Sequence, residues 1–454
     1  MKWNKKYSIT ISFGIILFVS VFTSMNVKWG DLRWHGIMGH DANGYYAYLP
    51  AVFIYDDLNF LFYDHELKEL KKENVNLNFD YRENYNNNKV NKYFIGTSIA
   101  QFPFFITAHV LSTPLGFESS GYSKIYYVFI ALAAIFYMLL GLLFFNKVLI
   151  LYDIDVLNRA ISLLALLFGT HLFYYTIFEP GMSHVYSFAF ITMMVYYGKK
   201  YFILPNTKTA IIYSLLLGLI TLIRPVNLLV ILLLPFIAGS FESLKNGLIY
   251  LFKTQGKTIL FSSIVFLLVL SIQLIIYKLQ TGSFLVYSYT EEGFNFLDPH
   301  MIAILFSYKK GLFLYTPLCL LAFIGMIKLY HRSRFETSVF IAFFLILTYI
   351  LSSWWIWWYG GSFSSRVYVD FLSLFGILLA LSLVYFKGKK TYRLYLLLIV
   401  FFILFNQKQT YLYRVAYIHW EDMNKEKYWQ STYHPFQLWY TRLMEEDSAS
   451  IQPE

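Results

Sequence analysis

The feature that most constrains the fold is a series of long apolar runs along the 454-residue chain. A helix needs about 20 apolar residues to cross the roughly 30 Å hydrocarbon core of a bilayer. Only 14% of the residues are charged, whereas an ordinary soluble domain carries about 25%. We therefore predict an all-α polytopic membrane protein with about eleven transmembrane helices. The predicted spans are residues 7–25, 124–146, 160–178, 182–198, 209–223, 225–241, 258–279, 311–330, 336–353, 370–386 and 391–405.

Basic residues near the ends of these runs indicate which loops face the cytoplasm. Lys2, Lys5 and Lys6 precede the first span, which places the amino terminus inside and the carboxyl tail outside. Because this distribution accounts for most of the net charge of +10, we expect no nucleic-acid partner. Clusters in alternate later loops support the same topology: Lys199/Lys200/Lys208, Lys245/Lys253/Lys257, Lys328/Arg332/Arg334 and Lys387/Lys389/Lys390/Arg393.

One further apolar run, residues 94–112, does not fit that alternation. Counting it as a span would move every later basic cluster to the outer side. We therefore predict an interfacial helix that lies on the membrane, like residues 45–62 before it. Residues 26–123 then form one large outer loop.

The remainder of that loop and the carboxyl end are polar. Residues 63–92 are rich in Asn, Lys and Glu and follow neither the helix nor the strand period, so we predict a solvated, irregular segment. We divide the chain into a transmembrane domain, residues 1–405, and a short outer tail, residues 406–454. The one cysteine, Cys319, excludes an intrachain disulfide and a cysteine-based metal site.

A short acidic motif follows the first span directly and reads Gly39-His40-Asp41-Ala42-Asn43-Gly44-Tyr45-Tyr46. A carboxylate at the bilayer surface is costly unless it is solvated, paired or used in function. The predicted topology places this one on the outer side, where it can activate an acceptor against a lipid-borne donor.

Other unusual polar groups fall on the same predicted side of the membrane. Acids, cations and aromatic residues that meet at one face suggest a cavity for a phosphorylated, sugar-bearing lipid. These groups are Glu179 and His184 in one turn, Arg224, Tyr289, Lys310, the aromatic stretch 354–359 and Arg366.

This order of features resembles the GT-C superfamily of glycosyltransferases, in particular the branch with protein O-mannosyltransferases and lipid A aminoarabinose transferases. Such proteins have a first outer loop with juxtamembrane helices, an acid soon after the first span and a second acid in the next outer turn. Asp41 and Glu179 stand at those positions. The likeness covers the amino-terminal half. Beyond about residue 230 only the hydropathy pattern and the Arg366 region match, and the second turn has Glu-Pro-Gly where an Asp is more usual.

The resemblance implies an enzyme of the bacterial inner membrane that uses a polyprenyl-phosphate-linked sugar as donor. Its acceptor would be a glycan, lipid or protein at the outer face, and its other partners would be membrane lipids. Asp41 would act as general base or as a metal ligand, and Glu179 would orient the acceptor or share a divalent ion with Asp41. We expect His40, Tyr45 and Tyr289 to contact the substrate.

Each acid also has a plainer interpretation. Asp41 can cap a surface helix that starts near Asn43. Glu179 can mark the end of a helix, with His184 capping the next one. Asp41, Glu179 and His184 suffice to hold a metal if they converge, so metal dependence stays open, although we expect no tightly bound ion.

The cations suit the phosphate that leaves when the sugar is transferred. Arginine binds phosphate in a bidentate manner, which favours Arg366, with Lys310 and Arg224 as weaker candidates. The alternative is that these cations anchor the chain at lipid headgroups. We expect an aromatic belt to account for most of the tryptophan cluster.

Three other classes compete with the transferase. A transporter or flippase for lipid-linked sugars would need polar groups through the whole membrane thickness, whereas the charges here lie at the ends of spans. A polymerase of the O-antigen type normally has its main loop late in the chain, whereas the largest loop here comes first. A GT-C fold without catalytic activity would serve as a scaffold.

Overall fold

The computed structural model describes residues 7–27, 29, 32–72, 79–86, 88–254 and 256–433. Lys2, Lys5, Lys6 and the end of the predicted tail, residues 434–454, lie outside these ranges. In the described part, six helices are long and apolar enough to cross a membrane, so the chain is a helical membrane protein. They are α1 (Ser8–Met25), α6 (Lys124–Leu151), α13 (Gly256–Thr281), α18 (Arg334–Ser352), η6–α19 (Arg366–Phe386) and α20 (Tyr392–Arg414).

The other predicted spans also fall on helices, two of them interrupted. Residues 160–178 break at Gly169, where a β-carbon would lie 2.5 Å from the Leu318 side chain. Residues 311–330 break before Pro317, which has no backbone N–H to continue a helix. The helices concerned are α7 (Val156–Phe168), α8 (Leu172–Ile177), α9 (His184–Ile203), α10 (Thr207–Ile223), α15 (Leu312–Tyr315), α16 (Pro317–Ala322) and α17 (Gly325–Arg332).

The chain bends sharply between residues 238 and 241, in the region after α10. The segment η4 (Pro225–Leu233), a 3₁₀-helix, continues into α11 (Leu234–Ala238) and then turns by 111° into α12 (Phe241–Ile249) and the π-helical turn η5 (Tyr250–Thr254). Gly239 lies at the bend with φ of 83°, a conformation that favours glycine.

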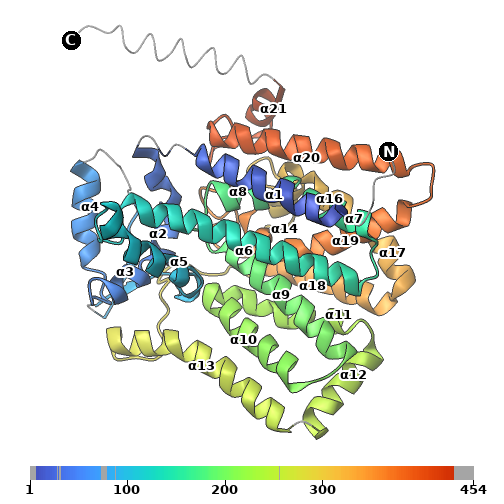
Figure 1. Cartoon of the computed structure of the whole chain (residues 1–454), viewed down its shortest axis with the longest axis horizontal. Coiled ribbons are helices and arrows are strands. Elements are labelled where there is room, and N and C mark those ends of the chain that lie inside the picture. The colour runs from blue at the N-terminus through green and yellow to red at the C-terminus, as the bar shows by residue number, and fades with distance from the viewer. Residues whose placement is uncertain are drawn as a thin grey trace.

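The centre of the bundle is α19, whose residues from Leu372 to Leu383 are buried on all sides. It packs against α7 and α17, while α9 lies between α6 and α10, and α13 covers the outer face of α10. Figure 1 shows these long helices with the elements of residues 26–123, here called the first loop, gathered beyond one end of the bundle. All functional candidates described below lie toward that end.

The first loop differs from the prediction in two ways. In place of the predicted surface helix over residues 45–62 there are two short helices, α2 (Asp41–Tyr46) and α3 (Tyr48–Phe53). The 3₁₀-helix η2 (Leu32–Met38) precedes them. The chain then turns because the Asp57 carboxylate accepts hydrogen bonds from the backbone N–H groups of Asn59, Leu61 and Phe62.

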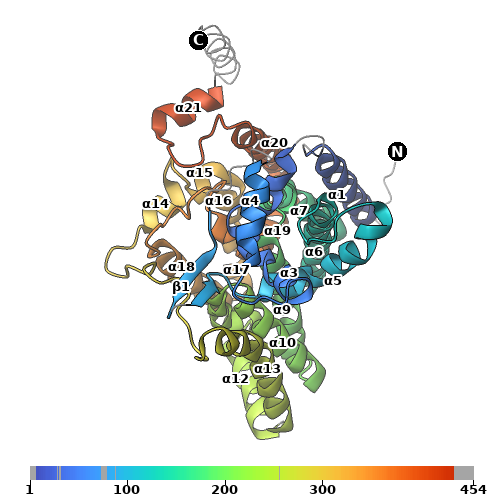
Figure 2. The same ribbon diagram turned by 90° about the vertical axis from the view of Figure 1, so that its left-hand side faces the viewer.

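Residues 63–92 are not irregular throughout, which corrects the second prediction. They contain most of α4 (Phe62–Lys72) and an antiparallel hairpin of β1 (Arg82–Tyr85) and β2 (Asn88–Asn91). The buried Arg82 side chain joins these parts, with ion pairs to Asp64 and Asp80. Figure 2 looks onto this end of the molecule, with α4 and β1 toward the viewer.

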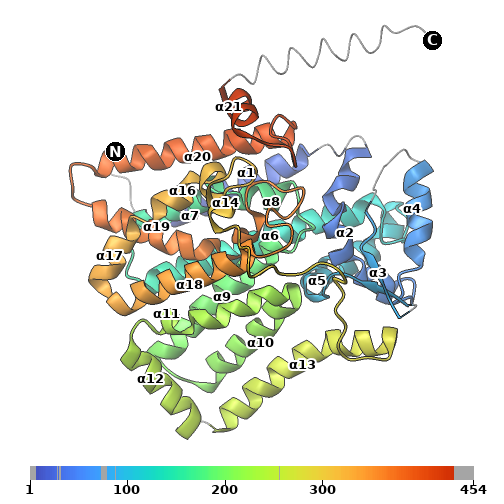
Figure 3. The same ribbon diagram turned by 180° about the vertical axis from the view of Figure 1, so that it is seen from behind.

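The predicted interfacial run forms α5 (Gly96–Ser112), followed by η3 (Thr113–Leu115), and α5 packs against α6 and α10. Gly96 permits a close approach to α10, since a β-carbon there would lie 2.3 Å from the backbone N of Ile223. Figure 3 shows, from behind, how the connection after α13 leads back toward α14 (Met301–Phe306) and the bundle.

The described part of the carboxyl end is largely helical. Helix α20 continues past the predicted end at residue 405 to Arg414, and α21 (Lys425–Tyr433) follows. The indole N–H of Trp429 donates to the Tyr308 hydroxyl at 3.2 Å, which holds α21 on the segment after α14.

Candidate active site

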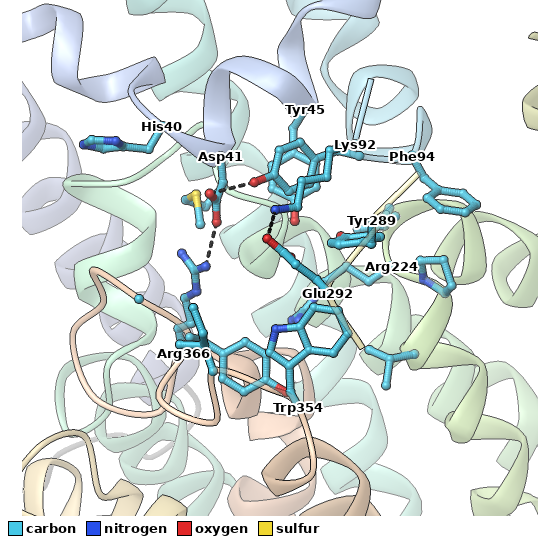
Figure 4. Close-up of a pocket in the computed structure, with 18 of the residues that line it drawn as sticks. His40, Asp41, Tyr45, Lys92, Phe94, Arg224, Tyr289, Glu292, Trp354 and Arg366 are labelled. Atoms are coloured by element: carbon cyan, nitrogen blue, oxygen red, sulfur yellow. Dashed lines mark hydrogen bonds and ion pairs between the residues drawn. The ribbon is translucent and has the colours of Figure 1, made fainter. Parts of the chain in front are cut away.

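A cavity of about 1250 Å³ opens where the first loop meets the bundle. Its walls come from α2, the turn between α8 and α9, the junction of α10 with η4, the α13–α14 connection and the segment between α18 and η6. Figure 4 shows the side chains that point into it. Residues 92–94, Tyr413 and Trp420 add to the lining, so segments far apart in sequence converge on one space.

Asp41 and Arg366 form an ion pair within this cavity. Arg366 Nη2 lies 2.6 Å from Asp41 Oδ2, and the Tyr93 hydroxyl donates to Asp41 Oδ1 at 2.7 Å (Figure 4). Asp41 is the first residue of α2, but its two oxygens bond other elements and do not cap the helix. Burial opposes ionisation, yet the guanidinium of Arg366 and the hydrogen bond from Tyr93 outweigh it and hold the pKa of Asp41 below its ordinary value.

Glu179 reaches the cavity from the turn before α9. Two residues further along this turn, Gly181 touches the first loop, because a β-carbon there would lie 2.8 Å from Ala42 Cβ and 2.9 Å from the Ile37 carbonyl oxygen. A side chain at that position would push the turn away from α2. The Tyr174 hydroxyl donates to Glu179 Oε1 at 2.9 Å. Burial raises the pKa of Glu179 to about 7, although Arg366 favours its ionised form.

Arg224, at the end of α10, is held from behind by a buried network. Its Nη1 atom lies 3.2 Å from Asp370 Oδ2 and 3.3 Å from His184 Nδ1. Asp370 is fully buried and pairs with His184 at 2.7 Å, and it accepts a further hydrogen bond from Asn227 at 2.8 Å. The guanidinium lines the cavity while its charge partner lies outside it.

A second ion pair, between Lys92 after β2 and Glu292, crosses the cavity wall (Figure 4). Ser288 also donates to the Lys92 carbonyl at 2.8 Å. On the other side of the connection, Phe294 forms an isolated β-bridge with Trp354. The α13–α14 connection is thus bonded both to the first loop and to the segment after α18.

Most of the residues predicted for the site lie in this one cavity: His40, Asp41, Tyr45, Glu179, Arg224, Tyr289 and Arg366. His184 and Lys310 lie behind its walls. The Lys310 ammonium group is buried and donates to the Ser362 carbonyl, and burial lowers its pKa to about 7 despite the nearby Glu179. Within the tryptophan cluster, Trp354 and Trp355 line the cavity.

The predicted metal ligands do not come together as a set. Among the described residues, no group of three or more His, Cys, Asp or Glu side chains is placed to hold a metal ion. Asp41 and Glu179 line the cavity, whereas His184 faces Asp370.

Several residues of the site were missed from the sequence. Asp370 was passed over because it begins an apolar run, although an acid among apolar residues is itself a signal of function. Tyr93 and Lys92 gave no signal, since their roles depend on contacts with distant segments.

The arrangement combines an ionised acid, an acid that titrates near neutral pH and two arginines in one partly buried space. Such a set can take a proton from a hydroxyl and stabilise an anionic leaving group. Neither a comparison with protein-family models nor one with curated proteins finds a match to this chain.

Proposed function

We propose that this protein is a glycosyltransferase of GT-C type that moves a sugar from a polyprenyl-phosphate-linked donor to an acceptor at the outer face of the membrane. The observation that carries the proposal is the convergence of Asp41, Glu179, Arg224 and Arg366 on one cavity that also has an apolar wall. A lipid-linked sugar phosphate has the same three parts, namely an apolar chain, an anion and a polyol. Its natural partners are therefore an apolar wall, arginines, and carboxylates with aromatic rings.

In the proposed reaction the acceptor hydroxyl attacks the anomeric carbon of the donor sugar. A bond forms between the acceptor oxygen and that carbon, and the bond from the carbon to the phosphate oxygen breaks. Asp41 takes the acceptor proton, and polyprenyl phosphate leaves with the bonding electron pair. Glu179 orients the acceptor hydroxyl.

Arg366 connects the two halves of this step. One of its five N–H donors bonds Asp41 in the structure. Its other donors are then able to bind the phosphate oxygen on which negative charge develops. Competition from the phosphate would weaken the pair with Asp41 and raise the basicity of that carboxylate as the donor binds.

We further propose eleven membrane crossings, with the amino terminus in the cytoplasm and the cavity on the outer side of a bacterial inner membrane. The distribution of Lys and Arg among the loops supports this orientation. Under this topology α5 lies at the membrane surface beside the cavity.

The proposal is tested by incubating the purified protein in lipid vesicles with a panel of short prenyl-phosphate-linked hexoses and pentoses. Release of prenyl phosphate from one of them, detected by mass spectrometry, supports a transferase. Movement of intact donor across the vesicle membrane without cleavage would identify a transporter instead. Neither cleavage nor movement with any donor would favour a scaffold.

A further inference from the structure

The segment η4 (Pro225–Leu233) is a nine-residue 3₁₀-helix, although such helices seldom exceed three or four residues. With three residues per turn, side chains three apart stand in line. The row Asn227, Val230 and Leu233 is fully buried against the bundle. The other two rows all line the cavity: Pro225, Leu228 and Ile231, and Val226, Leu229 and Leu232.

These two rows form a continuous apolar strip along one wall of the cavity. At a rise of about 2.0 Å per residue, nine residues give a strip of roughly 18 Å. Leu228, Ile231 and Leu232 are each 40–47% exposed, so the strip is open along its length. An α-helix of the same sequence would spread these side chains around its surface and would not give straight rows.

Arg224 stands at the head of this strip, directly before Pro225. Its guanidinium lines the cavity, and Asp370, His184 and Asn227 hold it from behind. Asn227 belongs to the buried row of η4, so the same residue that anchors the strip also bonds Asp370. The cation and the apolar strip are therefore fixed relative to each other.

We propose that Arg224 and η4 together form the seat of the lipid carrier: Arg224 shares the carrier phosphate with Arg366, which lines the same cavity, and the hydrocarbon chain lies along the two exposed rows of η4. This inference rests on the proposed function for the identity of the carrier. The shared chemistry is a phosphate ester on a single apolar chain. Asp370 is a positioning residue in this arrangement, because it touches Arg224 and not the cavity.

The alternative is that η4 simply faces bilayer lipid. Simple lipid exposure explains neither the cavity along both rows nor an arginine fixed at the head of the strip by a fully buried acid. A buried carboxylate is costly unless it is paired. We therefore infer that the network has a role, which is to orient the arginine. The seat also gives the cavity a direction. In Figure 4, Arg224 and Phe94 lie on one side of Asp41 and His40 on the other, which leaves the His40 side for the acceptor.

The test is a titration of the purified protein in detergent with farnesyl phosphate and, separately, with farnesol, followed by tryptophan fluorescence. Trp354 and Trp355 line the cavity and report on its occupant. Arg224→Gln should weaken farnesyl phosphate binding about ten- to a hundredfold and leave farnesol binding unchanged. Ile231→Ser should weaken the binding of both ligands. Arg334→Gln, an exposed arginine at the start of α18, is the matched control and should change neither.

Asp370→Asn separates a positioning role from a purely structural one. We expect it to weaken farnesyl phosphate binding and spare farnesol, whereas general loss of structure would reduce both. Because Asp370 is buried, its substitution can prevent folding, so Arg224→Lys provides a second test. This variant keeps the charge but loses the planar fork, and it should bind farnesyl phosphate less tightly than wild type.

The outcomes distinguish the two proposals. If wild type binds farnesyl phosphate no better than farnesol, the phosphate-linked donor and the proposed function fail together. If wild type prefers the phosphate and Arg224→Gln keeps that preference, the seat is wrong and the proposed function survives. Dioleoyl phosphatidic acid, which has two chains, should compete poorly. Equal competition would show an ordinary phospholipid site and overturn the inference.

Discussion

Asp41 of the first loop and Arg366 at the start of η6 are 325 residues apart in the chain and form an ion pair of 2.6 Å. Both side chains are about one-sixth exposed, at 17% and 15%, so solvent screens the pair only in part. The pair joins the first loop to the most deeply buried of the long apolar helices in the described part of the chain. It also places the proposed base beside a group that suits the donor phosphate.

Substitution of Arg366 distinguishes between two roles of this side chain, a phosphate ligand and a headgroup anchor. Arg366→Lys keeps the charge but loses the planar fork, so we expect impaired transfer, with Arg366→Ala more severely affected. Loss of a charge-assisted hydrogen bond commonly costs about 1.5–3 kcal/mol, roughly ten- to a hundredfold in rate. The measurement is the transfer rate of each purified variant beside its melting temperature. Wild-type rates in Arg366→Lys would indicate a mere anchor, because lysine reaches headgroups equally well.

Glu179 predicts a pH dependence with a definite sign. Its pKa in the folded protein, about 7, lies above its ordinary value of 4.5, so folding favours the protonated form. Its contribution to stability is full below about pH 4.5 and is lost as the pH rises through about 7. Glu179→Gln cannot ionise at this position. The difference in melting temperature, variant minus wild type, should therefore be larger at pH 8 than at pH 5. An equal difference at both pH values would contradict the raised pKa.

The buried ion pair of Lys199 and Glu336, at 3.3 Å, predicts a change in stability far from the cavity. Glu336→Ala leaves a buried ammonium group unpaired, and such a loss commonly costs about 3–5 kcal/mol. We expect a large fall in the melting temperature in detergent, and a partial recovery in the double variant Lys199→Met, Glu336→Leu. Asp155→Asn, which removes the more exposed pair with Lys387, is the control and should change stability by less than about 1 kcal/mol. Similar effects at the two sites would show that burial does not matter here.

The proposed topology is tested by single-cysteine labelling from the outer side. The one native cysteine, Cys319, is buried and can be replaced by serine to give a silent background. A cysteine at Asn86 should react with an impermeant reagent, whereas cysteines at Lys208 and Lys389 should react only after the membrane is opened. All three positions are exposed. If Asn86 proves cytoplasmic, α5 crosses the membrane and the proposed orientation of the cavity is wrong.

The helices of the bundle could be predicted because a long apolar run has few alternatives to a helix in a membrane. The candidate acid Asp41 could be found for a related reason, since a carboxylate beside a span is costly without a use. The sequence did not predict α4 or the β1–β2 hairpin, because these elements depend on Arg82, whose ion pairs join two separated segments. The periodicity of a short stretch of sequence does not reveal contacts between distant segments.

Asp370 shows the same limit within the site. Its three partners, His184, Arg224 and Asn227, come from three other elements. Arg224 could be named as a candidate from the sequence, but the network that holds it emerges only from the folded structure. The 3₁₀ form of η4 is likewise invisible in an apolar sequence that suits an α-helix equally well.

The most direct test of the account compares wild type with Asp41→Asn in the transfer of sugar from a prenyl-phosphate donor. The substitution keeps the size of the side chain and removes its negative charge. We predict a loss of transfer on the order of 10²–10⁴-fold, the range for a lost general base, with normal amounts of protein in the membrane. Transfer by Asp41→Asn at the wild-type rate would contradict the central claim that this carboxylate activates the acceptor.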